Sequence, residues 1–399
     1  MTTASENKSP PHFSELLDER SGVARKKLAH LHSEIASGHG QNEDFSFDGP
    51  KTATGKREAA GPASSTPTEN STAYNTNAVP SDHDDDFSEQ DLGSLPPLEG
   101  FEWRDLVFEE IDPLDLRVMH GREEIKLMTY RWAPANERKA VVFLLHGYGS
   151  CSPHLAVLAK FLAANDYEVF AFDYRGQGDS EGERGVFLNS EQIYGDCWAM
   201  IFEACKKFKI NQQKTPLFLF GRSFGGLLAS NMANTLIGRS MFAGVVLLTP
   251  YYRLFTERLY DVYRMLIPLS IVKPNHKFVC EYAELDPEWV AKYKQIFEDT
   301  RNLEFFTAMT ARLWVEEQET ARTSIAEAPM PICFITATED GVVRNDYIEE
   351  FAALAKHPMN ELHKVVGANH TDVCFDENYG SHFVRSTLGF IRKIVARRD

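Results

Sequence analysis

The 399-residue sequence lacks the features that mark membrane-spanning and secreted proteins. No apolar run approaches the ~18 residues that a membrane-spanning helix needs, and the first residues contain no apolar core of a signal peptide. The six cysteines form neither a C-x-x-C pair nor a zinc-ligand spacing, which is typical of scattered reduced thiols. These absences favour a cytoplasmic protein that meets membranes only peripherally.

Basic residues are fewer than acidic residues in this sequence. The sequence has 42 lysines and arginines against 58 aspartates and glutamates, and its formal net charge is -16. An acidic surface gains nothing from a phosphate backbone, so we do not expect nucleic acid as a partner. The chain is 43% hydrophobic and 12% aromatic, which is enough to bury a large core.

Composition divides the chain into two regions. Residues 1–97 are rich in Ser, Thr, Gly, Pro, Asn and Asp and poor in apolar residues. Such a segment buries too little surface to offset its ordering entropy, so it predicts a disordered acidic tail. One stretch within it, 14–37, has leucines at helical spacing, as short transient helices do. Residues 98–399 are predicted to form the folded domain.

Strand and helix patterns alternate through the second region. Strands are predicted over 123–134, 139–147, 167–176, 216–220, 242–250, 331–338 and 362–367. Helices are predicted over 154–166, 189–209, 223–238, 347–357 and 380–398, with Asn189 or Ser190 as the N-cap of the second. This alternation indicates an α/β fold with a mostly parallel sheet and helices on both faces. In such folds the chemistry gathers at the carboxyl ends of the strands.

Two stretches match G-x-S-x-G, the nucleophile-elbow pattern of serine hydrolases. Ser223 has the predicted strand 216–220 before it and a predicted helix after it, with glycines that allow the tight turn. Ser180 lies several residues beyond a strand, is not followed by a helix, and has Glu181 beside it. A carboxylate there opposes a developing oxyanion. We therefore predict Ser223 as the nucleophile and assign Ser180 to a loop.

A nucleophilic serine needs a histidine base and a carboxylate that orients it. Glu339 and Asp340 both follow the predicted strand 331–338, so spacing leaves either of them open as the acid. His370 lies in the loop after the last strand and is the predicted base. The oxyanion needs backbone donors, for which we predict the amides of Phe224 and Tyr148. Tyr148 lies in a glycine-rich loop that we expect His146 to brace.

Together these motifs resemble the monoglyceride lipase and lysophospholipase branch of the α/β-hydrolases, which stands beside the S33-type serine peptidases. The resemblance covers about residue 100 to the end and rests on HGYGS, FDYRGQGDSEGERG, GRSFGG, TATEDGVV and GANH. It implies Ser223 as nucleophile, Asp340 as acid, His370 as base, and Tyr148 with Phe224 as the oxyanion hole. The chain departs from the family at Arg222, where a histidine is usual, and at Ala337, where a glycine is usual.

The region 251–328 does not continue the alternation of strands and helices. It is helical in pattern and rich in Tyr, Phe, Leu, Met and Ile. The resemblance implies a cap insertion here, whose inner face would line an acyl-chain pocket and whose outer face would contact membranes transiently.

The predicted function is hydrolysis of a small lipid-like ester, a monoacylglycerol or lysophospholipid, through an acyl-enzyme intermediate without a metal or organic cofactor. Three alternatives remain open. An acyltransferase would use the same triad with another acceptor. An S33-like peptidase would need a carboxylate in the cap, for which Glu257, Asp261, Glu304 and Glu316 are candidates. A non-catalytic binding or receptor protein would keep the fold and use the tail to recruit partners.

Overall fold

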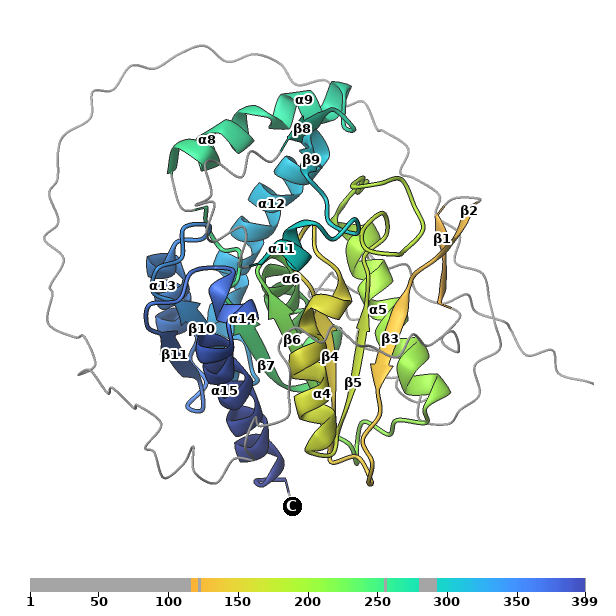
Figure 1. Cartoon of the computed structure of the whole chain (residues 1–399), viewed down its shortest axis with the longest axis vertical. Helices are drawn as coiled ribbons and strands as arrows, with labels where there is room; N and C mark the ends of the chain where they lie inside the picture. Colours follow the sequence, from red (N-terminus) through yellow and green to blue (C-terminus); the bar gives the residue numbers. More distant parts are fainter. Residues whose placement is uncertain (1–115, 121–122, 255–256, 280–292, 399) are drawn as a thin grey trace, which may run out of the picture. The chain divides into compact units, whose positions relative to one another are not determined.

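The structure is a computed structural model that describes residues 116–120, 123–254, 257–279 and 293–398 (Figure 1). The chain divides into two units, and every described residue belongs to one of them. The predicted disordered tail, residues 1–97, and the helix predicted within it lie outside the described residues.

A seven-stranded sheet forms the centre of the described unit, in the order β11-β10-β7-β6-β4-β5-β3. Neighbouring strands are parallel except β3 and β5, which are antiparallel. The strands are β3 (Thr129–Trp132), β4 (Ala140–Leu145), β5 (Tyr167–Phe172), β6 (Leu217–Arg222), β7 (Phe242–Leu248), β10 (Ile332–Ala337) and β11 (Glu361–Val365). Every residue of β4, β5, β6, β7 and β10 is buried, which explains their continuous apolar runs.

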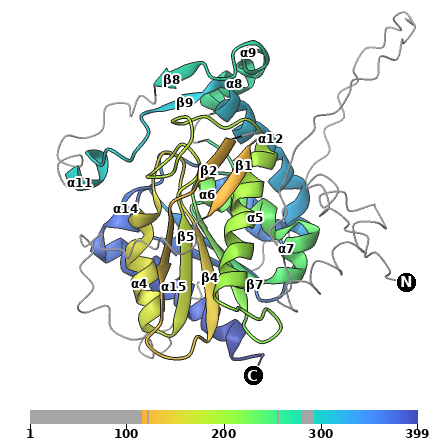
Figure 2. The same cartoon turned by 90° about the vertical axis from the view of Figure 1, so that its right-hand side faces the viewer.

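Helices cover both faces of this sheet, as the sequence predicted. They are α4 (Ala156–Ala164), α5 (Ser190–Lys207), α6 (Phe224–Ala233), α7 (Leu236–Met241), α13 (Asn345–Leu354), α14 (Asp372–Phe375) and α15 (Glu377–Val395). Helices α4 and α15 lie on one side of the sheet and α5 and α7 on the other (Figure 2). Asn189 caps α5 by accepting a hydrogen bond from Gln192 N, which confirms one of the two predicted N-caps.

The strand predicted over 123–134 is two strands. β2 (Glu123–Lys126) pairs with β1 (Arg117–His120) in a separate antiparallel ladder, and β3 alone joins the large sheet. Between them, Lys126 N donates to Glu181 Oε2 and Met128 N to Ser180 Oγ, both over 2.8 Å. The loop that contains Ser180 therefore occupies the backbone donors that a continuous strand would have used.

Two predicted helices are also divided. The helix predicted over 223–238 ends at Ala233, and α7 begins after Thr235, whose hydroxyl accepts from Gly238 N. The helix predicted over 154–166 begins as the 3-10 turn η2 (Ser152–Leu155), where Pro153 occupies the first turn.

The segment between β7 and β10 contains α8 (Glu257–Met265), α9 (Ile267–Val272), β8 (Lys277–Val279), α11 (Lys294–Phe297), β9 (Phe305–Thr307), α12 (Ala308–Ser324) and η3 (Ile325–Glu327). Its described part adds no strand to the large sheet, because β8 and β9 pair only with each other. Helix α12 packs on α6, and α8 and α9 pack in turn on α12 (Figure 1). Within the described ranges, no helix combines the length and apolar character that crossing a membrane requires.

Candidate active site

Ser223 lies in the turn between β6 and α6, with φ 52° and ψ -118°. Positive φ is uncommon for a residue with a side chain and marks a tight turn at this point. A Cβ at Gly221 would lie 2.2 Å from Gly225 O, and one at Gly225 would lie 2.2 Å from Leu145 O. The two glycines are therefore required by the close approach of the chain around Ser223, as in a nucleophile elbow.

Asp340 and His370 meet after the ends of β10 and β11. His370 Nδ1 lies 2.7 Å from Asp340 Oδ2. The other carboxylate oxygen of Asp340 accepts from the backbone N–H groups of Val342 and Val343, at 2.8 and 2.9 Å. Because an ionised carboxylate only accepts, His370 Nδ1 carries the proton and Nε2 is left as an acceptor. Glu339, the other candidate acid, is exposed.

The segment that bears His370 is tied to the elbow through Arg222, the residue before the serine. Arg222 Nη2 donates to His370 O over 3.0 Å, and its guanidinium lies 5.3 Å from the Phe375 ring. Arg222 is buried although it is charged. The structure thus brings Asp340 and His370 together and links them to the Ser223 turn. It contains no hydrogen bond between Ser223 Oγ and His370 within the described residues.

The loop after β4 lies against the other side of the elbow. Gly149 N donates to Gln177 Oε1 over 2.8 Å and Ser150 N donates to Gly147 O over 3.2 Å, so these two amides are already used within the protein. The assignment of the Tyr148 amide as an oxyanion donor stays a prediction. The Tyr148 side chain donates to Phe305 O over 3.1 Å and packs edge-on against Phe224.

His146 holds the start of this loop. Its Nδ1 lies 2.8 Å from Gly147 O, and Tyr174 N donates to its Nε2 over 3.2 Å. Burial lowers the pKa of His146 to about 3, because a charged imidazole would lose its hydration. A neutral histidine with both ring nitrogens bonded to the backbone acts as a brace rather than as a base.

The Ser180 hydroxyl is engaged in hydrogen bonds that hold the surrounding backbone. It donates to Asp173 O over 2.6 Å and accepts from Met128 N. Positive φ values at Gly176, Gly178, Gly182 and Gly185 confirm that this loop needs its glycines. Asp179 N donates to Asp173 Oδ2 and Arg184 Nη1 donates to Gly178 O, both within the loop. Arg175 ties the loop to α5 through a buried bidentate pair with Asp196.

Aromatic rings extend from the elbow into the segment between β7 and β10. Tyr148 packs against Phe224 and Trp314, and Trp314 packs against Tyr263 and Phe306. These contacts connect α6, the loop after β4, α8, β9 and α12 in one apolar cluster. Such a cluster can exclude water from chemistry at Ser223.

Several residues near the site carried no sequence signal of their role. The glycine-rich motif around Gln177 did not indicate that its side chain accepts a hydrogen bond from Gly149 N. Glu317 on α12 is buried and accepts from Tyr194 and Asn231. His154 bonds Ser150 and Asp299. Except for the contact between Ser150 and His154, these contacts join residues 28 to 145 positions apart, which spacing alone does not reveal.

Three of the four carboxylates suggested for a peptidase are exposed to solvent. Asp261, Glu304 and Glu316 are exposed, and Glu316 pairs with Arg312 at 2.7 Å. The side chain of Glu257 lies outside the described residues.

Sequence comparison now identifies the family. A family model described as serine aminopeptidase, S33, matches residues 136–377, more than half of the chain. The chain therefore belongs to this family of α/β-hydrolases. By sequence it is similar, over part of its length, to the monoglyceride lipase-like branch.

Among the relatives, human monoglyceride lipase is 35% identical over 119 residues, which cover 30% of this chain and 37% of that protein. A putative monoglyceride lipase of Schizosaccharomyces pombe is 24% identical over 237 residues, which cover 56% of this chain and 60% of that protein. The chain thus spans about a third of the length of human monoglyceride lipase.

Two solved structures share the fold. A soluble variant of Saccharomyces cerevisiae monoglyceride lipase, in complex with a substrate analog, gives a TM-score of 0.62 at 18% identity, covering 73% of this chain and 98% of that one. Paleococcus ferrophilus monoacylglycerol lipase gives a TM-score of 0.56 at 20% identity. The match covers 68% of this chain and 99% of that one. These likenesses confirm the predicted α/β-hydrolase fold.

Proposed function

We propose that this protein is a serine hydrolase that cleaves the carboxylic ester of a monoacylglycerol or a lysophospholipid. The observation that carries the proposal is the elbow at Ser223 joined through Arg222 to the buried Asp340–His370 pair. Family membership supports it, since relatives over parts of the chain are monoglyceride lipases.

The proposed reaction has two steps. His370 Nε2 takes the proton of Ser223 Oγ as the oxygen attacks the ester carbonyl, and then gives that proton to the leaving alcohol. His370 Nε2 then deprotonates a water that attacks the acyl-enzyme carbonyl, and it returns that proton to Ser223 Oγ as the bond to the acyl group breaks and the fatty acid leaves. Asp340 keeps the proton on Nδ1 and stabilises the imidazolium that forms in each step. The amides of Phe224 and Tyr148 stabilise the oxyanion.

The substrate class follows from the surroundings of the serine. The cluster of Tyr148, Phe224, Trp314, Tyr263 and Phe306 suits an acyl chain better than a polar substrate. We therefore assign residues 98–399 to one hydrolase domain and residues 251–328 to its cap.

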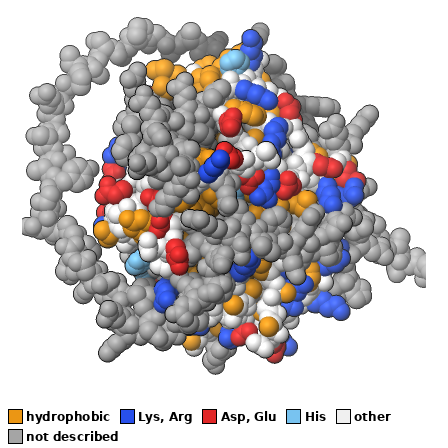
Figure 3. All heavy atoms as spheres, viewed as in Figure 1, with side chains coloured by type: hydrophobic (Ala, Val, Ile, Leu, Met, Phe, Trp, Pro, Cys, Tyr) orange, Lys and Arg blue, Asp and Glu red, His pale blue; other side chains and the backbone are white. Residues whose placement is uncertain are grey.

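The outer face of this cap carries exposed apolar side chains. Met265, Ile271 and Val272 on α8 and α9 are 75%, 71% and 73% exposed. Figure 3 shows hydrophobic side chains on the upper part of the molecule, where these helices lie. A lipid ester resides in membranes or micelles, so we propose that this face contacts them transiently. The five described cysteines are unpaired and buried, which fits a reducing cytoplasmic setting.

Labelling of the full-length folded protein with a fluorophosphonate probe tests the proposal. We expect a single modified residue, Ser223, identified by mass spectrometry, and equal labelling of the Ser180→Ala variant. A folded protein whose Ser223 stays unmodified would be a non-catalytic member of the fold.

A substrate panel tests the class of ester. Monoacylglycerols, lysophospholipids and p-nitrophenyl esters are compared with aminoacyl amides, and acyl transfer to added alcohols is measured alongside. We expect hydrolysis of the glycerol-based esters. Preference for the amides would instead indicate a peptidase, and transfer that outruns hydrolysis would indicate an acyltransferase.

A further inference from the structure

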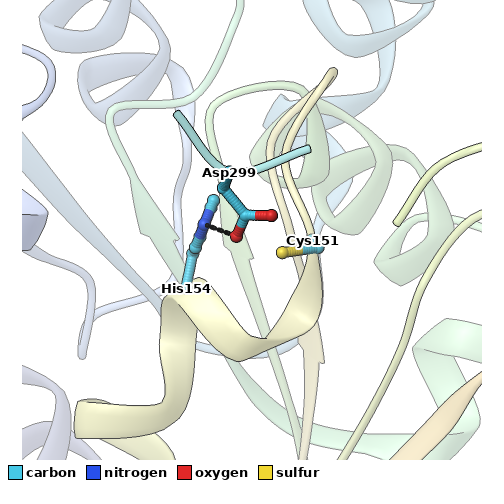
Figure 4. Close-up of side chains that lie close together, drawn as sticks. All are labelled: Cys151, His154 and Asp299. Atoms are coloured by element: carbon cyan, nitrogen blue, oxygen red, sulfur yellow. Dashed lines mark hydrogen bonds and ion pairs between the residues drawn. The ribbon is translucent and has the colours of Figure 1, made fainter. Parts of the chain in front are cut away.

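Three potential metal ligands converge beside the loop after β4. His154 lies in the turn η2, Cys151 is its N-cap residue, and Asp299 lies in the segment after α11. The Cys151 sulfur, a ring nitrogen of His154 and a carboxylate oxygen of Asp299 all lie within 4.8 Å of one another. Figure 4 shows the Asp299 carboxylate facing both the His154 ring and the Cys151 sulfur. The proposed hydrolysis uses none of them.

The donor set is one that zinc prefers. Thiolate, imidazole and carboxylate are its usual protein ligands, and three of them with a water complete a tetrahedral site. Zinc–ligand bonds of 2.0–2.3 Å put neighbouring donor atoms about 3.5 Å apart. The donors here need to approach by roughly 1 Å, which small side-chain rotations provide. Cys151 and His154 are three residues apart at a 3-10 turn, where such positions lie on one side.

Two further side chains orient the ligands. Ser150 Oγ lies 2.7 Å from His154 Nδ1, and His154 Nε2 lies 3.1 Å from Asp299 Oδ2. If the His154 proton moves to Nδ1, the Ser150 hydroxyl accepts it in a hydrogen bond and Nε2 is left for a metal. Arg301 holds the Asp299 carboxylate with its Nε and Nη2, at 2.9 and 2.6 Å. Ligands in zinc sites are commonly held this way.

Charged groups of both signs surround the cluster. Asp173 lies near Cys151, Arg301 pairs with Asp299 at 2.6 Å, and Asp179 lies 3.8 Å from Arg301. Burial raises the pKa of the Cys151 thiol, so it is the metal that would stabilise the thiolate.

We propose that Cys151, His154 and Asp299 form a zinc site that joins η2 to the segment after α11. Binding breaks the Cys151 S–H bond, forms a zinc–sulfur bond and releases one proton to solvent. The shift of the His154 proton from Nε2 to Nδ1 adds no further release. Leu303 N donates to Gly149 O over 2.9 Å, so the bound ion would also tie that segment to the loop that holds Tyr148.

The test measures metal binding by the full-length protein after treatment with a chelator. Calorimetric titration with Zn²⁺ is expected to give one ion and one released proton per chain. Co²⁺, used as a spectroscopic probe, is expected to give a thiolate-to-metal charge-transfer band. Cys151→Ser should abolish that band, and His154→Gln or Asp299→Asn should weaken binding at least about tenfold.

A second cluster in the protein supplies the matched control. Cys333, Glu361 and His363 also lie within 4.8 Å of one another, and Glu361 bonds Lys393 and His363. These residues are not part of the proposed site, so His363→Gln is expected to leave zinc binding unchanged. Loss of binding in His363→Gln, with Cys151→Ser unaffected, would overturn the proposal.

X-ray absorption at the zinc edge of the wild-type protein gives a readout that does not depend on how well the variants fold. One sulfur neighbour is expected, and a shell without sulfur would overturn the proposal. Because no turnover is measured, zinc binding by a protein that hydrolyses no ester would leave this inference standing. An active hydrolase that binds no zinc would overturn the zinc-site proposal and leave the proposed function standing.

Discussion

Ser223 holds a backbone conformation that most residues avoid, and the structure around it explains why the conformation persists. Its N–H donates to Leu248 O over 2.9 Å, while its carbonyl accepts from Leu227 N and Tyr251 N. A positive φ at a residue with a side chain costs of order 1–3 kcal/mol, and these bonds hold the residue in that position. The strain lies where the nucleophile is proposed.

The Ser223 hydroxyl is the proposed nucleophile, whereas the Ser180 hydroxyl forms structural hydrogen bonds. Substitution by alanine should therefore affect activity at Ser223 and stability at Ser180. We expect Ser223→Ala to abolish hydrolysis of a p-nitrophenyl ester and to leave the unfolding free energy nearly unchanged. Ser180→Ala should retain activity but lower the unfolding free energy by about 1–3 kcal/mol, because Met128 N and Asp173 O lose their partner. Esterase assays and urea unfolding measure both. An inactive Ser180→Ala beside an active Ser223→Ala would reverse the assignment.

At the scale of elements, the β6–α6 turn depends on backbones that approach closely. Gly225→Ala should abolish activity and destabilise the fold by a few kcal/mol, since its Cβ would collide with Leu145 O. Gly195→Ala is the matched control. Gly195 lies within α5 with no atom within 4 Å of a built Cβ, and alanine there should add roughly 0.5–1 kcal/mol of stability. Equal stability of the two variants would contradict this account of the elbow.

Helix α12 is held to the sheet-covering helices by the buried Glu317. Tyr194 on α5 and Asn231 on α6 both donate to its carboxylate. Tyr194→Phe removes one of these donors, and we expect the unfolding free energy to fall by about 1–3 kcal/mol. Urea unfolding measures the change.

The same substitution elsewhere on α12 provides the comparison. Tyr260 also donates to a carboxylate of α12, Glu319, over 3.0 Å, but Glu319 is exposed and water can replace the lost hydroxyl. Tyr260→Phe should therefore cost at most about 1 kcal/mol. If Tyr194→Phe and Tyr260→Phe lower the unfolding free energy equally, burial of Glu317 does not strengthen its hydrogen bond.

At the scale of the whole molecule, the apolar face of α8 and α9 should matter only when the substrate is in a lipid phase. Replacing Met265 and Ile271 by Glu should lower hydrolysis of vesicle-bound monoacylglycerol several-fold, because apolar area no longer enters the interface. Hydrolysis of a water-soluble p-nitrophenyl ester should not change. A parallel loss on both substrates would show that these residues act on the site itself.

The first 97 residues offer the second test at this scale. Their composition predicts a solubilising tail rather than part of the catalytic domain. Deleting residues 1–97 should leave kcat and KM for a soluble ester within about twofold of the full-length values. A large fall in kcat would give the tail a role in catalysis.

Prediction from sequence worked where a local pattern is enough. The buried strands appeared as continuous apolar runs, and the strand-turn-helix around Ser223 and the loop around Ser180 were both predicted from the residues on either side. The patterns did not separate Glu339 from Asp340, because the two are adjacent. Burial and the bond from His370 distinguish them in the structure. The strand over 123–134 was wrong for a similar reason: the loop around Ser180 interrupts it from outside.

The sequence by itself determined the alternation of strands and helices and the positions of the elbow and of the loops after the strands. These follow from period, turn chemistry and residue order, which are properties of neighbouring residues. The family followed from the resemblance of five motifs to those of known proteins. Only the tertiary structure decided which distant groups meet: Tyr194 with Glu317, 123 positions apart, and His154 with Asp299, 145 apart. The physical reason is that a local pattern specifies which face of an element is buried. The partner of a buried polar group depends on how the whole chain packs.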